Sequence, residues 1–204
     1  MRAKRVNTIE LPSFRIKLGS GFILIFALIY FFDGSGFLSA LFPAVLIHEL
    51  GHIFLMLLFG VRPTQLKATL SGFEISYSGA ISEKQEMLTA LAGPAFGLIF
   101  SLICARLGQL RQNDYLLLCA GLGFVINTFN LLPALPLDGG RVLLFAFRAL
   151  FGEGKAQRLI RCVGLLAALL LVVCGLYFIA KGFGFALFFA GVWLFTLQQN
   201  KSCK

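Results

Sequence analysis

Long apolar runs separated by short polar stretches dominate the chain. Runs of helical length lie at residues 18–32, 37–59, 87–107, 115–132, 162–180 and 183–197. A helix needs about 20 apolar residues to cross a bilayer, so the first and last runs are on the short side. We therefore predict an all-α polytopic membrane protein with about six transmembrane helices, and five spans as the alternative.

Two of the stretches between the apolar runs have sequence patterns that predict local structure. Between the second and third runs, residues around Phe73–Tyr77 alternate between apolar and polar, which is typical of a short strand or hairpin. Between the fourth and fifth runs, Pro133, Pro136 and the pair Gly139-Gly140 break the helical pattern. A short amphipathic helix is predicted after this break, from about Val142 to Phe151.

The composition supports a membrane protein and argues against nucleic-acid binding and a disulfide framework. Of 204 residues, 58% are hydrophobic and only 13% are charged, whereas soluble domains carry about a quarter charged residues. The net charge of +9 is typical of cytoplasmic Lys and Arg in a membrane protein. No basic stretch interleaved with aromatic residues suggests nucleic-acid binding. The five scattered cysteines include no CxxC pair, so a disulfide framework is not expected.

The distribution of Lys and Arg along the chain predicts its orientation in the membrane. With six spans and a cytoplasmic N-terminus, all 18 Lys and Arg residues except Arg106, Arg111 and Lys181 fall on the cytoplasmic side. We therefore expect a multi-pass protein of the cell membrane with both termini in the cytoplasm. No convincing cleavage site follows the first apolar run, so we interpret it as a retained helix after a basic tail, residues 1–17.

The second apolar run contains the pattern H-E-x-x-H, as His48-Glu49-Leu50-Gly51-His52. Residues four apart lie on one face of a helix, so the two histidines can offer nitrogens to a single Zn²⁺. Glu49 is positioned to act as a general base toward a water at the metal. The pattern also occurs by chance in unrelated proteins. Here, however, these are the only two histidines of the chain, and they lie where ionisable residues are costly and usually functional.

A catalytic zinc site usually has a third protein ligand. Of the nine acidic residues, only Glu49 and Asp138 are embedded in apolar sequence. In the predicted topology, His52 lies in the inner half of the second span, and Asp138 follows the inner end of the fourth. Both therefore reach the cytoplasmic side of the membrane, which makes Asp138 the candidate third ligand.

These residues resemble the site-2 protease family of intramembrane zinc metalloproteases. The resemblance is carried by HELGH at 48–52 and by the pattern N-x-x-P-x-x-x-x-D-G, which runs from Asn130 to Gly139. It implies that His48, His52 and Asp138 ligate one zinc ion and that Glu49 activates water. It also implies that Asn130 holds the substrate peptide or the developing oxyanion; a plain hydrogen bond at a helix end is the alternative.

The resemblance further implies an architecture. We expect a three-helix catalytic core at residues 37–141, a small β hairpin at 66–79 and a re-entrant loop rich in proline and glycine that aims Asp138 at the metal. The hairpin is either an edge for an extended substrate or an ordinary loop. The family pattern G-P-x-x-N is only partly present, because Gly97 stands where Asn is expected, and we interpret Gly93 and Gly97 as helix-packing residues.

We therefore predict a compact, single membrane-embedded peptidase domain at residues 18–204, similar to the sporulation-type members. Its expected reaction is hydrolysis of a peptide bond in a transmembrane or membrane-tethered protein near the cytoplasmic side. Expected partners are that substrate, the lipid bilayer and a membrane regulatory protein, and no nucleic acid. Two alternatives remain: a non-proteolytic zinc-binding protein or metal transporter, and buried hydrogen-bonding histidines without a metal.

Overall fold

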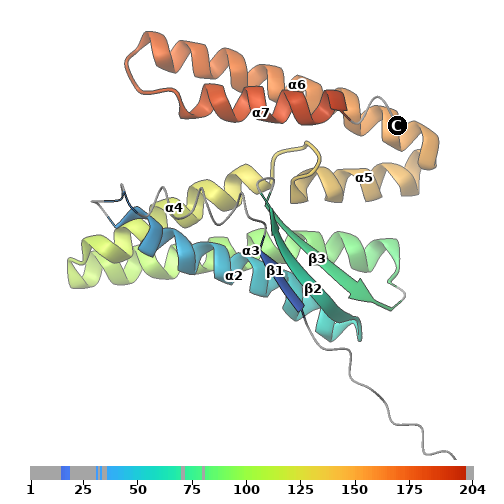
Figure 1. Cartoon of the computed structure of the whole chain (residues 1–204), viewed down its shortest axis with the longest axis horizontal. Helices are drawn as coiled ribbons and strands as arrows, with labels where there is room; N and C mark the ends of the chain where they lie inside the picture. The colour runs from blue at the N-terminus through green and yellow to red at the C-terminus, as the bar shows by residue number, and fades with distance from the viewer. Residues whose placement is uncertain are drawn as a thin grey trace, which may run out of the picture.

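The structure is a computed structural model that describes residues 15–18, 31, 33, 36–69, 72–79 and 81–200. The described part is mostly helical, with one small sheet (Figure 1). Its helices are α2 (Phe37–Leu58), α3 (Glu83–Arg111), α4 (Asp114–Asn130), α5 (Asp138–Phe151), α6 (Glu153–Ala180) and α7 (Ala186–Asn200). Its strands are β1 (Arg15–Leu18), β2 (Arg62–Thr69) and β3 (Gly72–Ser78).

Among the described residues, α2, α3 and α6 are long and apolar enough to cross a membrane. The helices α4 and α7 are apolar but shorter. This confirms a membrane protein, whereas the number of six spans stays a prediction. Most of the first predicted span, residues 18–32, lies outside the described residues, and Leu18 itself belongs to β1.

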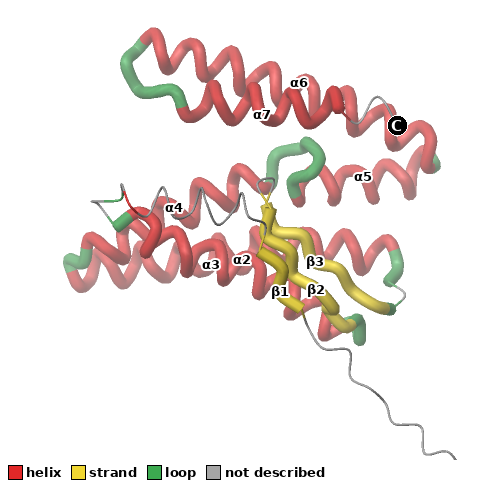
Figure 2. The backbone as a smooth tube through the Cα atoms, viewed as in Figure 1, coloured by secondary structure: helices red, strands yellow, loops and turns green. Residues whose placement is uncertain are grey.

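The predicted hairpin is present, and it belongs to a larger sheet (Figure 2). Strands β2 and β3 pair antiparallel, as the alternation around Phe73–Tyr77 indicated. Strand β1 pairs parallel to β2, and the sequence pattern did not predict it. The Tyr77 hydroxyl donates a 2.6 Å hydrogen bond to the Glu86 carboxylate at the start of α3. Partial burial and this hydrogen bond raise the pKa of Tyr77 to about 12, so the donor persists at physiological pH and fixes β3 to α3.

The helices form two groups joined by α5. Helices α2, α3 and α4 pack against one another, and α6 pairs with α7. Helix α5 contacts both α3 and α6, and in Figure 1 it lies between the α6–α7 pair and α3. The helical core is thus built around α3, and the segment that leads into α5 connects it to the C-terminal pair.

The segment between α4 and α5 is held by the C-terminal helix pair. Ala134 and Leu137 pack in a buried cluster with Ala168 of α6 and Leu194 of α7. The Gln198 side-chain amide of α7 donates a hydrogen bond to the Leu135 carbonyl. The C-terminal helix pair therefore fixes the loop that precedes Asp138.

Helix α5 begins at Asp138, earlier than the predicted amphipathic helix. Its first turn packs directly on the backbone of the preceding loop. A Cβ at Gly139 would collide with the Leu131 carbonyl, and one at Gly140 with the Ala134 carbonyl carbon. The Gly-Gly pair was predicted to break the helix, but it lies inside the first turn of α5, where it allows close backbone contact.

We expect Gly139→Ala to destabilise the protein, because the new methyl group meets backbone that cannot rotate away. The cost of such overpacking is roughly 1–3 kcal/mol, visible as a lower melting temperature in detergent. Gly121→Ala is the matched control, since a Cβ on this α4 glycine meets nothing within 4 Å. Equal melting temperatures for the two variants would contradict the close packing of α5 on the loop.

Candidate metal centre

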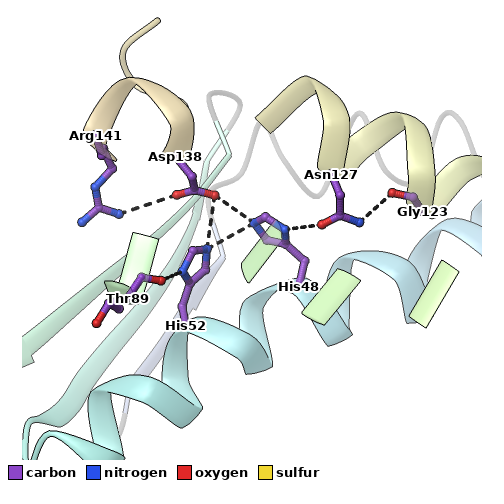
Figure 3. Close-up of polar contacts among 7 residues, drawn as sticks. All are labelled: His48, His52, Thr89, Gly123, Asn127, Asp138 and Arg141. Atoms are coloured by element: carbon purple, nitrogen blue, oxygen red, sulfur yellow. Dashed lines mark hydrogen bonds and ion pairs between the residues drawn. The ribbon is translucent and has the colours of Figure 1, made fainter. Parts of the chain in front are cut away.

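Three side chains from two helices converge on one point (Figure 3). Helix α2 supplies His48 and His52, one turn apart, and Asp138 is the first residue of α5. The two Nε2 atoms lie 3.2 Å apart. Asp138 Oδ2 lies 3.2 Å from His48 Nε2 and 3.3 Å from His52 Nε2. The residues predicted as ligands from the sequence are therefore brought together, and all three are buried.

In each imidazole, the hydrogen bond made by Nδ1 determines whether Nε2 has a lone pair available for a metal. His52 Nδ1 lies 2.7 Å from the Thr89 carbonyl oxygen, which can only accept, so His52 carries its proton on Nδ1. His48 Nδ1 lies 2.7 Å from Asn127 Oδ1, and the Asn127 amide nitrogen donates to the Gly123 carbonyl. That second bond orients the amide so that its oxygen faces His48. In its neutral form, each imidazole consequently turns an Nε2 lone pair inward.

The donor set fits a divalent metal. Two imidazole lone pairs and a carboxylate oxygen face one another, which is unfavourable in a buried site unless a cation lies between them. Ligands about 2.0–2.1 Å from a tetrahedral zinc are roughly 3.3 Å apart, which is the spacing found between the three atoms here. Nitrogen and carboxylate ligands of this kind suit zinc.

Close helix contact fixes the His52 ring. A Cβ at Gly93 of α3 would collide with His52 Nε2, so only glycine allows α3 to pass at this distance. A Cβ at Gly51 would lie 2.6 Å from the Ala92 carbonyl oxygen, so α2 also approaches α3 without a side chain between them. The packing role predicted for Gly93 is thus present, and it acts directly on a candidate ligand.

Asp138 is stabilised as a carboxylate by its surroundings. It lies in the first turn of α5, where the helix dipole favours negative charge. Arg141, one turn later, places Nη1 3.9 Å from Asp138 Oδ1. The arginine contacts the outer oxygen, which leaves Oδ2 directed at the histidines.

Two predicted site residues remain, Glu49 and Asn130. Glu49 is half-buried, and its carboxylate interacts electrostatically with both histidines and with Asp138. Asn130 is the half-buried last residue of α4. Within the described part of the chain, no hydrogen bond joins Asn130 to the three converging side chains, so its assigned role stays a prediction.

The sequence reasoning missed the two groups that orient the histidines. Thr89 contributes through its backbone carbonyl, for which residue identity gives no signal. Asn127 did have a signal, since it is an amide inside a predicted transmembrane run, where polar residues usually have a function.

Comparisons with known proteins find similarity to metalloproteases. Residues 107–173 match peptidase family M50, and this range includes Asp138 but not the two histidines. A zinc metalloprotease of Methanocaldococcus jannaschii is 29% identical over 141 residues, covering 67% of this chain and 41% of that protein. Rip3 of Mycobacterium tuberculosis is 28% identical over 198 residues, covering 87% of this chain and 49% of that protein. The chain thus spans less than half the length of these relatives.

A solved structure shares the fold. The site-2 protease from Methanocaldococcus jannaschii aligns with a TM-score of 0.69 and 22% sequence identity, over 96% of this chain and 94% of that one. Together with the family match and the zinc metalloprotease relative, this confirms the resemblance to the site-2 protease family.

We expect Asp138→Asn to weaken zinc binding strongly, because it keeps the size of the side chain but removes the charge that balances the cation. Elemental analysis of purified protein should give about one zinc per chain for the wild type and much less for the variant. Asp114→Asn is the matched control, since Asp114 is the first residue of α4 as Asp138 is of α5. Equal zinc content in both variants would exclude Asp138 as a ligand.

Proposed function

We propose that this chain, a relative of the site-2 proteases of peptidase family M50, is an intramembrane zinc metalloendopeptidase. Its substrate would be a transmembrane or membrane-tethered protein. The observation that carries the proposal is the convergence of His48, His52 and Asp138 within 3.2–3.3 Å of one another, beside the half-buried Glu49. Zinc metalloproteases among the relatives support the same reaction.

Each side chain has a part in this reaction. His48, His52 and Asp138 would hold one Zn²⁺, which when bound polarises the scissile carbonyl and lowers the pKa of the attacking water. Glu49 would take the proton from that water and pass it to the leaving amine nitrogen. Asn130 would hold the substrate backbone or the developing oxyanion. Hydrolysis then yields one new carboxylate and one new amino group.

The proposed topology follows from the charge pattern. Six spans with both termini in the cytoplasm place the metal centre toward the cytoplasmic side of the membrane. The catalytic core would comprise residues 37–141 within a peptidase domain at 18–204, after a basic tail at 1–17. The loop before Asp138 would be re-entrant, since irregular backbone at membrane depth needs protein or water around it. A membrane regulatory protein is the further partner we propose.

A membrane substrate is supported by where the site lies. His48 and His52 belong to α2, one of the helices long and apolar enough to span the bilayer. A helical substrate hides its peptide bonds and must become extended before attack. In the three-stranded sheet, β1 and β3 are the outer strands, so an extended segment could pair with one of these edges.

The proposal is tested with Glu49→Gln, measured on a reconstituted single-span protein that the wild-type chain cleaves. The variant should keep about one zinc per chain, because Glu49 is not a ligand, but lose cleavage by roughly 10²–10⁴-fold, the usual contribution of a general base. Glu83→Gln at the exposed start of α3 is the control.

Undiminished cleavage by Glu49→Gln would disprove the role of Glu49. Zinc uptake into vesicles without cleavage of any membrane protein would instead support the metal-transporter alternative. Absence of zinc from the wild-type protein would favour histidines that serve only as buried hydrogen-bonding groups.

A further inference from the structure

Asn127 is the polar side chain most completely enclosed beside the metal centre, and the proposed reaction gives it no part. It is 0% exposed and lies on α4, opposite the α2 helix that carries the histidines. Its amide oxygen lies 2.7 Å from His48 Nδ1, and its amide nitrogen donates a 2.6 Å hydrogen bond to the Gly123 carbonyl (Figure 3). Both ends of the amide are therefore satisfied.

These two bonds act in series. The Gly123 carbonyl can only accept, so the amide nitrogen must face it and the oxygen must face His48. The oxygen in turn requires a proton on His48 Nδ1, which leaves Nε2 as a lone pair directed at His52 and Asp138. A carbonyl of the α4 backbone thus determines, through one side chain, which nitrogen of His48 is available to a metal.

The two histidines differ in how they are held. His52 donates to the Thr89 backbone carbonyl, which no substitution of Thr89 removes. His48 depends on a side chain, so its orientation is sensitive to a single substitution. A substitution at Asn127 therefore alters the hydrogen-bond partner of a candidate ligand without changing the ligand itself.

Gly97 of α3 makes room for this amide. A Cβ at Gly97 would collide with the Asn127 amide, including its oxygen and nitrogen atoms. Gly97 is also the position at which the chain departs from the family pattern G-P-x-x-N. The absence of a side chain on α3 is therefore matched by a buried amide that enters the same space from α4.

We propose that Asn127 is a positioning residue that fixes the tautomer and ring orientation of His48 for zinc, and that Gly97 is required to leave it space. The proposal rests on the proposed function, since it needs His48 to ligate zinc. Partners of metal-ligating histidines commonly contribute about 10–100-fold to metal affinity.

The test compares two variants of similar shape. Asn127→Leu keeps the branched bulk but leaves the His48 N–H without an acceptor. Asn127→Asp keeps an oxygen at the accepting position, and as the carboxylic acid it donates from its other oxygen to the Gly123 carbonyl. We expect zinc affinity, measured by chelator competition on the full chain in detergent, to fall about 10–100-fold in Asn127→Leu and clearly less in Asn127→Asp. The visible absorption of the Co²⁺-loaded protein should shift in Asn127→Leu, because the geometry around the metal changes.

Thr128→Val is the matched control, since Thr128 is exposed on the same helix and should leave both measurements unchanged. Wild-type zinc affinity and an unshifted Co²⁺ spectrum in Asn127→Leu would overturn the proposal. Equal losses in the Leu and Asp variants would also overturn it, because the loss would then come from packing rather than from the acceptor.

A double-mutant cycle tests the role of Gly97. Gly97→Ala alone should weaken zinc binding, because the new methyl group displaces the Asn127 amide. Added to Asn127→Ala it should weaken binding little further, since the side chain it displaces is already gone. Additive losses would overturn the role assigned to Gly97.

A separate measurement distinguishes failure of this inference from failure of the proposed function. If wild-type protein binds zinc no better than His48→Ala, the proposed function itself fails. If His48→Ala loses zinc while Asn127→Leu behaves as wild type, only the positioning role of Asn127 fails.

Discussion

The burial of three mutually facing electron-pair donors is the constraint on which the rest of the structure depends. Two imidazole nitrogens and a carboxylate oxygen lie within 3.2–3.3 Å of one another in an apolar setting. Such an arrangement is unfavourable unless a metal ion or a shared proton lies between the donors, and it must be maintained by the surrounding fold. Each donor is accordingly fixed by a different element: His52 by a carbonyl of α3, His48 by an amide of α4, and Asp138 by the start of α5.

This constraint explains why close backbone contacts surround the site. The His52 ring fits against α3 because residue 93 has no Cβ, and the Asn127 amide fits because residue 97 has none. The first turn of α5 rests on the preceding loop through Gly139 for the same reason. Small residues allow membrane helices to approach closely, and here that approach also places the groups that orient the ligands.

The sequence predicted which side chains converge far better than it predicted the groups that hold them. His48 and His52 could be found because helical spacing is a local property, and Asp138 because an acid in apolar sequence is conspicuous. The β2–β3 hairpin also followed from local alternation. Asn127 and the Thr89 carbonyl could not be assigned to particular histidines, because those contacts depend on how α3 and α4 align with α2. Strand β1 was missed because its parallel pairing with β2 joins segments far apart in the chain.

The support of Asp138 reaches beyond the helices that hold the histidines. The loop before it packs through Ala134 and Leu137 against Ala168 of α6 and Leu194 of α7, and Gln198 of α7 bonds its backbone. His48 and His52 belong instead to α2, within the α2–α3–α4 group. The donor set is therefore divided between the α2–α3–α4 group and α5, and the loop before α5 rests on the α6–α7 pair. Since zinc needs all three donors at tetrahedral spacing, the relative position of the two groups determines whether the metal centre is complete.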